Sequence, residues 1–97
     1  MSKDTILNEI RSALKKVMDP EIGIDIVSAG FVRDVRIVDE NIVEIDLMLT
    51  TPFCPLSNWI AMQAKRAAES VKGVKEARVR IVGFGIPDEL KRLLKLP

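Results

Sequence analysis

Thr50-Thr51-Pro52-Phe53-Cys54-Pro55-Leu56-Ser57-Asn58-Trp59 is the stretch around which the fold of this chain is organised. Before it, apolar residues alternate with other residues, as they do in a half-buried strand: Val43, Ile45, Leu47 and Leu49. After it, apolar residues recur three or four positions apart, as on one face of a helix: Leu56, Ile60, Ala64, Ala67 and Val71. The stretch therefore predicts a strand that turns directly into a helix.

Two prolines place the turn and set the surroundings of the chain's single cysteine. Pro52 disfavours helical backbone angles at Thr51, whereas Pro55 suits the first position of a helix, where its missing N–H costs nothing. Cys54 is therefore predicted at the N-cap or next to it. A thiol there faces free backbone N–H groups and the positive end of the helix dipole, and both favour the thiolate.

The segments before this stretch predict a helix, a connector and a hairpin. The first helix has one apolar face and ends before Asp19-Pro20: Ile6, Ile10, Ala13, Leu14 and Val17. Residues 21–27 are predicted to be an extended connector whose aliphatic side chains are buried. Residues 31–38 and 42–49 are rich in β-formers and flank the turn residues 39–41, which predicts an antiparallel hairpin. Phe31, Arg33, Val35 and Ile37 are predicted to share one face of its first strand.

The segments after it predict a helix over 55–72, a third strand over 74–82 and a short last helix. The strand–helix–strand order makes the third strand parallel to residues 42–49, but leaves open which strand it lies beside. Arg78 and Arg80 are predicted to point outward, where they could pair with Glu44 and Asp46. The last helix should place its leucines on one side: Leu90, Leu93 and Leu94.

These elements predict a single small α+β domain over residues 1–97. Their order is α-β-β-α-β-α, a three-stranded mixed sheet with helices packed against it. Residues 82–97 form a C-terminal extension of this domain and contain the short last helix.

Composition excludes several classes of function. A net charge of +1 over 97 residues does not favour nucleic-acid binding, and no apolar run approaches the ~20 residues of a membrane helix. One cysteine cannot form an internal disulfide and the N-terminus has no signal-peptide pattern, so we expect a reducing, cytoplasmic setting. Because the chain has no histidine, it cannot by itself supply Ser-His-Asp catalysis, Cys-His catalysis or a His-ligated zinc site.

Two motifs together resemble the iron–sulfur cluster assembly (FSCA) domain family. Residues 18–27 read MDPEIGIDIV and are followed by Gly30, which is similar to the family's "DPE…IV..G" opening. Residues 49–56 read LTTPFCPL, which is similar to its "LTTP.CP" motif. The resemblance extends to about Val82, and the family includes SufT-type maturation proteins and the PaaD protein of phenylacetate degradation.

The resemblance implies that five residues gather in one shallow pocket: Asp19, Glu21, Thr50, Thr51 and Cys54. The grouping is compatible with the sequence if the connector lies against the end of the strand at 42–49. The resemblance also implies a non-enzymatic factor, an adapter or carrier that delivers iron–sulfur clusters. Its expected partners are other assembly proteins and client apoproteins.

The number of thiols limits what one chain can carry. A cluster normally takes four thiolate ligands, and this chain offers only Cys54. We therefore expect no stably bound cofactor in the monomer. A homodimer that pairs two Cys54 residues, or one Cys54 with ligands from another molecule, could hold an iron–sulfur cluster transiently.

Two other functions remain open from the sequence. Cys54 could be the nucleophile of a thiol enzyme, with Asp19 or Glu21 as general acid or base. Alternatively, the chain could be a PaaD-like accessory subunit in aromatic-compound metabolism. A structural role is also open, in which Cys54 is a buried inert thiol and the two acids belong to a solvated helix stop.

Overall fold

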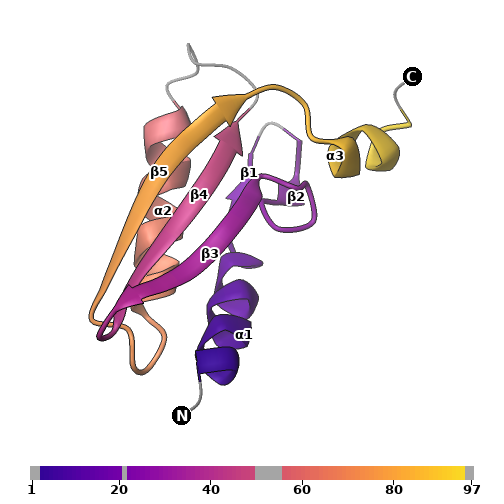
Figure 1. Ribbon diagram of the computed structural model, residues 1–97. Coiled ribbons are helices and arrows are strands. Elements are labelled where there is room, and N and C mark those ends of the chain that lie inside the picture. The colour runs from indigo at the N-terminus through magenta and orange to yellow at the C-terminus, as the bar shows by residue number, and fades with distance from the viewer. Residues whose placement is uncertain (1–2, 21, 50–55, 96–97) are drawn as a thin grey trace.

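The computed structural model describes residues 3–20, 22–49 and 56–95 (Figure 1). Its helices and strands are α1 (Lys3–Leu14), β1 (Met18–Asp19), β2 (Ile24–Asp25), β3 (Val32–Asp39), β4 (Ile42–Leu49), α2 (Leu56–Glu69), β5 (Glu76–Phe84) and α3 (Asp88–Leu93). The main sheet has the order β3-β4-β5, with β3 antiparallel and β5 parallel to β4. This arrangement confirms the predicted α+β fold and shows that the third strand lies beside β4.

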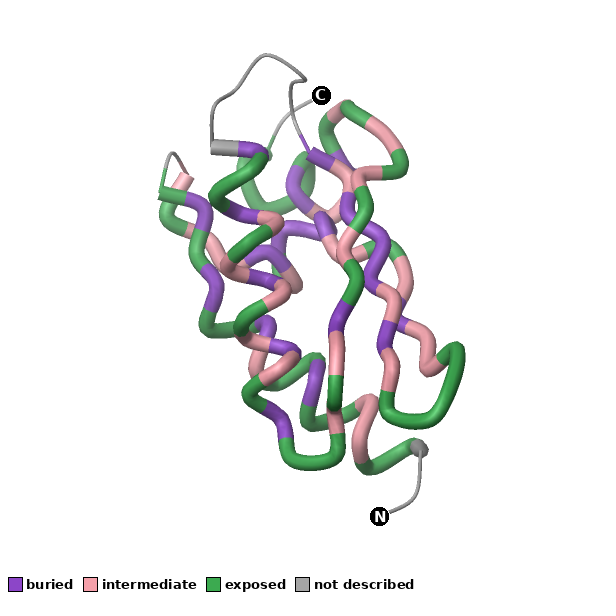
Figure 2. Tube along the Cα trace, turned by 90° about the vertical axis from the view of Figure 1, so that its left-hand side faces the viewer, coloured by how far each residue is buried: buried purple, intermediate pink, exposed green. Residues whose placement is uncertain are grey.

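The two long helices cover one face of the sheet and enclose the core. α2 packs against β5 and β4, and α1 packs against β3 and α2. The alternating residues of β4 that were predicted to face inward are all buried: Val43, Ile45, Leu47 and Leu49. Figure 2 shows the buried residues gathered between the helices and the sheet. Burial of these aliphatic side chains supplies the main driving force for the fold.

The connector after α1 differs from the prediction, because it folds into a two-stranded antiparallel hairpin. Met18 and Asp19 of β1 pair with Asp25 and Ile24 of β2. Gly23, at a φ of +67°, closes the turn by donating its N–H to the Asp19 carbonyl at 2.8 Å. The expected burial of aliphatic residues does hold, since Ile26 is fully buried. A turn tightened by glycine lets the segment reverse direction and still bury that side chain.

A register shift in β3 corrects the predicted faces of that strand. The shift lies between Val32 and Asp34 in the pairing with β4. As a result Val32 packs against the core, while Arg33 is exposed and donates to the Gly30 carbonyl at 3.1 Å. The strict period-two alternation used for the prediction fails wherever a bulge inserts an unpaired residue.

The other face of the sheet carries a network of charged side chains. Asp46 accepts hydrogen bonds from Arg36 Nη1 at 2.9 Å and from Arg80 Nε at 2.8 Å. Arg36 also pairs with Asp34 and with Glu44. The predicted pair between Arg80 and Asp46 is therefore present, but Arg78 pairs with Glu76 on its own strand instead of with Glu44. Arg36 lies directly opposite Glu44 in the β3–β4 register, and its guanidinium engages that carboxylate.

The ends of α2 and β5, and the burial of the leucines in and after α3, differ from the sequence-based expectations. α2 ends at Glu69, three residues before the predicted end, and the chain then turns with Ser70 N–H bonded to the Arg66 and Ala67 carbonyls. β5 continues to Phe84. In α3 only Leu90 is buried, whereas Leu93 and Leu94 are exposed. The spacing of the leucines predicted one buried face, but this six-residue helix buries only one side chain against the rest of the domain.

Gly30 lies where the start of α3 meets the segment before β3. Its φ is +81°, and a Cβ built there would lie 2.9 Å from Pro87 Cβ and would overlap the Glu89 carboxylate. We predict that Gly30→Ala lowers the free energy of unfolding by about 2 kcal/mol, because the strain of a left-handed backbone and the steric overlap of the new Cβ both destabilise the fold. Urea denaturation measures the loss. Gly23→Ala is the matched control, since Gly23 has a φ of +67° and no neighbour within 4 Å. Equal losses would show that the approach of α3 adds nothing.

The charge network predicts how acid destabilises the fold. Hydrogen bonds from Arg36 and then Arg80 hold the pKa of Asp46 well below its usual range. A lowered folded-state pKa stabilises the protein above the unfolded pKa of about 4, and this stabilisation is lost as pH falls. Asp46→Asn should therefore reduce the free energy of unfolding at pH 7 by about 1 kcal/mol, and by progressively less below pH ~4. Chemical denaturation across pH tests this, with Glu76→Gln as the exposed-pair control. A loss that stayed constant down to pH ~2 would contradict it.

Candidate functional site

The predicted site lies at the carboxyl end of β4, where the described chain stops at Leu49 and resumes at Leu56. Four of its five predicted residues lie outside the described residues: Glu21, Thr50, Thr51 and Cys54. The fifth, Asp19, is described and is 6% exposed. The structure therefore describes the elements next to the site, whereas the grouping of the five residues stays a prediction.

A chain of backbone hydrogen bonds ties the β1–β2 hairpin to this end of β4. Ile26 N–H donates to the Val17 carbonyl at 3.0 Å, and Phe31 N–H donates to the Ile26 carbonyl at 2.9 Å. Met48 N–H, one residue before the end of β4, in turn donates to the Phe31 carbonyl at 2.8 Å. Gly85 N–H reaches the same end of the strand, where it donates to the Leu49 carbonyl at 2.8 Å. Asp19 is thus held by a segment that is bonded stepwise to β4.

Two buried polar residues lie in the elements that lead to the predicted site, β1 and the start of α2. Among the described residues, three polar or charged side chains are buried: Asp19, Asp46 and Ser57. Asp46 belongs to the charge network on the open face, but Asp19 lies in β1 and Ser57 lies at the start of α2. Buried polar groups are costly unless they are hydrogen-bonded. No buried side-chain N or O atom in the described part of the chain lacks a partner.

The described residues do not assemble a metal site by themselves. No group of three or more Asp or Glu side chains within residues 3–20, 22–49 and 56–95 is arranged to hold a metal ion. The carboxylates of the open face are instead neutralised by Arg36 and Arg80.

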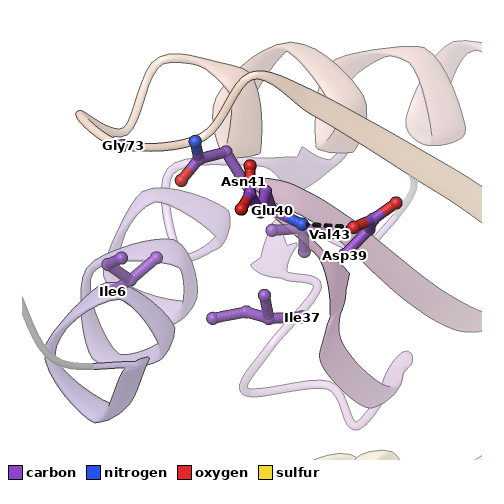
Figure 3. Close-up of a pocket in the computed structure, with 7 residues that line it drawn as sticks. All are labelled: Ile6, Ile37, Asp39, Glu40, Asn41, Val43 and Gly73. Carbon is purple, nitrogen blue, oxygen red and sulfur yellow. Dashed lines mark hydrogen bonds between the residues drawn. The ribbon is translucent and has the colours of Figure 1, made fainter.

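A cavity that was not predicted from the sequence lies at the opposite end of β4. It has a volume of about 390 Å³ and lies between α1, the β3–β4 turn and the segment after α2. Figure 3 shows Ile6 and Ile37 beneath the turn that carries Glu40 and Asn41. Asn41 adopts a φ of +63°, and its carbonyl accepts the N–H of Lys75 at 2.7 Å. Because it opens beside the start of β4, this cavity is separate from the predicted site.

Comparisons with known proteins agree with this fold and with the motifs. Residues 7–81 match the family model described as iron–sulfur cluster assembly protein. The chain belongs to this family. It is 39% identical over 95 residues to an uncharacterised protein of Methanocaldococcus jannaschii, which covers 98% of this chain and 96% of that protein.

One relative and one solved structure add a functional name and a fold. The chain is 36% identical over 80 residues to the Fe-S protein maturation auxiliary factor YitW of Bacillus subtilis, covering 82% of this chain and 78% of YitW. It also superimposes on a domain of unknown function from Bacillus anthracis with a TM-score of 0.79 at 28% identity, covering 97% and 95% of the two chains. No helix in the described part of the chain is long and apolar enough to cross a membrane.

The segment that holds Asp19 depends on one side chain in β2. The Asp25 carboxylate accepts the N–H of Val27 at 3.1 Å and that of Ser28 at 2.9 Å. We predict that Asp25→Ala lowers the free energy of unfolding by about 1 kcal/mol and speeds hydrogen exchange at both amides, because they lose their acceptor. Asp25→Asn keeps an acceptor oxygen and should lose less. Unchanged exchange in the alanine variant would show that the turn does not depend on this carboxylate.

Proposed function

We propose that this protein is an iron–sulfur maturation factor that acts as an adapter or transient carrier and is not an enzyme. The match of residues 7–81 to the iron–sulfur cluster assembly family carries the proposal. YitW, which is named an Fe-S protein maturation auxiliary factor, supports it because 78% of its length aligns with this chain. The working partners would be assembly proteins that supply a cluster and apoproteins that receive it, in a reducing, cytoplasmic setting.

Cys54 is proposed to contact the cluster, which is cargo and not a resident cofactor. A thiolate is the form that binds iron, and a cysteine at a helix start is favoured as the thiolate. One chain supplies one such ligand, so the remaining ligands must come from a second copy or from the donor or client protein. Sharing ligands in this way suits a carrier, because a cluster that the carrier holds through a single cysteine can be released to another protein.

Asp19, Glu21, Thr50 and Thr51 are proposed to border Cys54. Support comes from the bonding of the β1–β2 hairpin to the end of β4, one residue before Thr50. The hydroxyl groups could donate hydrogen bonds to a thiolate or to cluster sulfur, and such bonds would stabilise the negative charge on the sulfur. The carboxylates could supply oxygen ligands or accept protons from the thiol.

Cluster delivery in vitro tests the proposal. A scaffold protein loaded with a cluster is mixed with an apo-ferredoxin, and the visible absorption of the ferredoxin reports arrival of the cluster. We predict that the wild-type protein accelerates arrival, whereas Cys54→Ala leaves it at the rate measured without the protein. The physical reason is that alanine removes the only thiolate that the chain can offer.

Asn58→Ala is the matched control, because Asn58 is an exposed residue in the first turn of α2. It should accelerate cluster arrival as the wild type does. Full activity of Cys54→Ala would refute the assigned site, and failure of the wild type with every donor and client would refute the carrier role. Anaerobic purification with metal analysis and native mass then reveals whether two copies share a cluster.

A further inference from the structure

A groove with exposed apolar walls runs beside the predicted site, between the end of α1, β1 and α2. Its volume is about 420 Å³. Its lining includes Lys16, Met18, Trp59, Gln63, Arg66 and Ser70. Met18 lies in β1 next to Asp19, and Trp59 lies in α2, five positions after Cys54 in the sequence.

The apolar walls of the groove are exposed. Trp59 is 45% exposed and Met18 is 44% exposed, and Met62 extends the apolar strip one turn further along α2 at 52%. Val17, which is buried, continues the groove floor toward the core. Aromatic residues and methionine are enriched in protein–protein interfaces, where they anchor a partner's apolar side chains.

The charged side chains that line the groove have one sign. Lys16 and Arg66 are both exposed, and no Asp or Glu is among the described lining residues. Neither forms an ion pair within the described part of the chain, in contrast to Lys65 on α2, whose ammonium pairs with Glu69 at 2.9 Å. The groove continues past Lys16 and Ser70 into a shallower hollow that contains Lys72 and one acid, Glu9. The potential at the groove is thus positive, which favours an acidic occupant.

We propose that this groove binds an acidic, amphipathic segment of a partner protein. Apolar side chains of the segment would lie on Trp59 and Met18, and its carboxylates would pair with Lys16 and Arg66. Gln63 can donate and accept hydrogen bonds with its backbone, whereas the Ser70 hydroxyl, which already donates to the Ala67 carbonyl at 2.6 Å, can accept one. The inference rests on the proposed function only in identifying the partner as a cluster donor or a client apoprotein. Two cations in a chain of net charge +1 are too few for a nucleic acid to be the natural ligand.

Trp59 makes the groove directly observable, because the chain has one tryptophan and no tyrosine. The probe is a capped peptide of repeating Leu-Glu-Glu-Leu units, titrated at low salt while the fluorescence emission is recorded. We expect a saturable blue shift that weakens as salt is added. The same peptide with every Glu replaced by Gln should bind about tenfold more weakly or worse, which corresponds to 1.4 kcal/mol.

A pair of charge-reversal variants separates the groove from general electrostatics. Lys16→Glu combined with Arg66→Glu should weaken binding of the acidic peptide at least about tenfold. Lys91→Glu combined with Arg92→Glu is the matched control, since it makes the same change in net charge at exposed residues of α3. It should change the affinity little. Thermal unfolding of both variants verifies that each remains folded.

Three outcomes would overturn the inference. The first is no saturable shift with the acidic peptide, and the second is equal weakening by the two double variants. The third is a shift produced only by vesicles containing phosphatidylglycerol, which would assign the surface to a membrane.

Repeating the titration with Cys54→Ala separates this inference from the proposed function. Peptide binding should persist in that variant. Lost cluster delivery with intact peptide binding supports both conclusions, whereas delivery that needs Cys54 in a protein that binds no peptide refutes the groove alone. Peptide binding by a protein that delivers no cluster refutes the carrier role alone.

Discussion

The central strand β4 is hydrogen-bonded along both edges, and the rest of the domain depends on that double pairing. β3 satisfies one edge in antiparallel register and β5 satisfies the other in parallel register. The helix-facing residues of β4 must then be apolar, and they are among the most deeply buried in the chain. A parallel neighbour also requires a crossover, which is the length of chain that α2 occupies. Residues 50–55, which include Cys54, are therefore the part of the sequence that leads from β4 into this crossover.

The two faces of the sheet differ in what stabilises them. On the helix side, aliphatic burial stabilises the fold, whereas the open side bears charges that must be neutralised where they stand. Arg36 does this for three carboxylates at once, which leaves Asp46 only 8% exposed yet fully paired. Such interleaved charges make a closed network and not an anion-binding surface. Charge available to a ligand is instead found on the helical side, at Lys16 and Arg66.

One end of the molecule gathers the features that suit an adapter. There the β1–β2 hairpin is bonded to the end of β4, Asp19 in β1 and Ser57 at the start of α2 are buried, and Trp59 and Met18 are exposed. A chain with a single cysteine cannot by itself supply the four thiolates that a cluster normally takes. Under the proposed function, the remaining ligands come from the protein that docks on this chain.

The sequence by itself determined what local periodicity and short motifs can encode. The alternation in β4 and the spacing in α2 predicted both elements, because each period reflects burial of one face. The two motifs predicted the family, which the match over residues 7–81 confirms. Asp19, Glu21, Thr50, Thr51 and Cys54 were chosen from those motifs, and their grouping remains a prediction.

Only the tertiary structure decided how distant segments pair. β5 lies beside β4 and not beside β3, and the residue pattern of β5 alone is compatible with either position. The bulge that exposes Arg33 and the pairing of Arg36 with Glu44 follow from the β3–β4 register, whereas the β1–β2 hairpin is a separate sheet. The groove was not predicted because Lys16 lies in the turn after α1 whereas Arg66 lies on α2, 50 positions later in the sequence. Each looks like an ordinary solvated charge until the packing of α1 against α2 brings the two side chains to one groove.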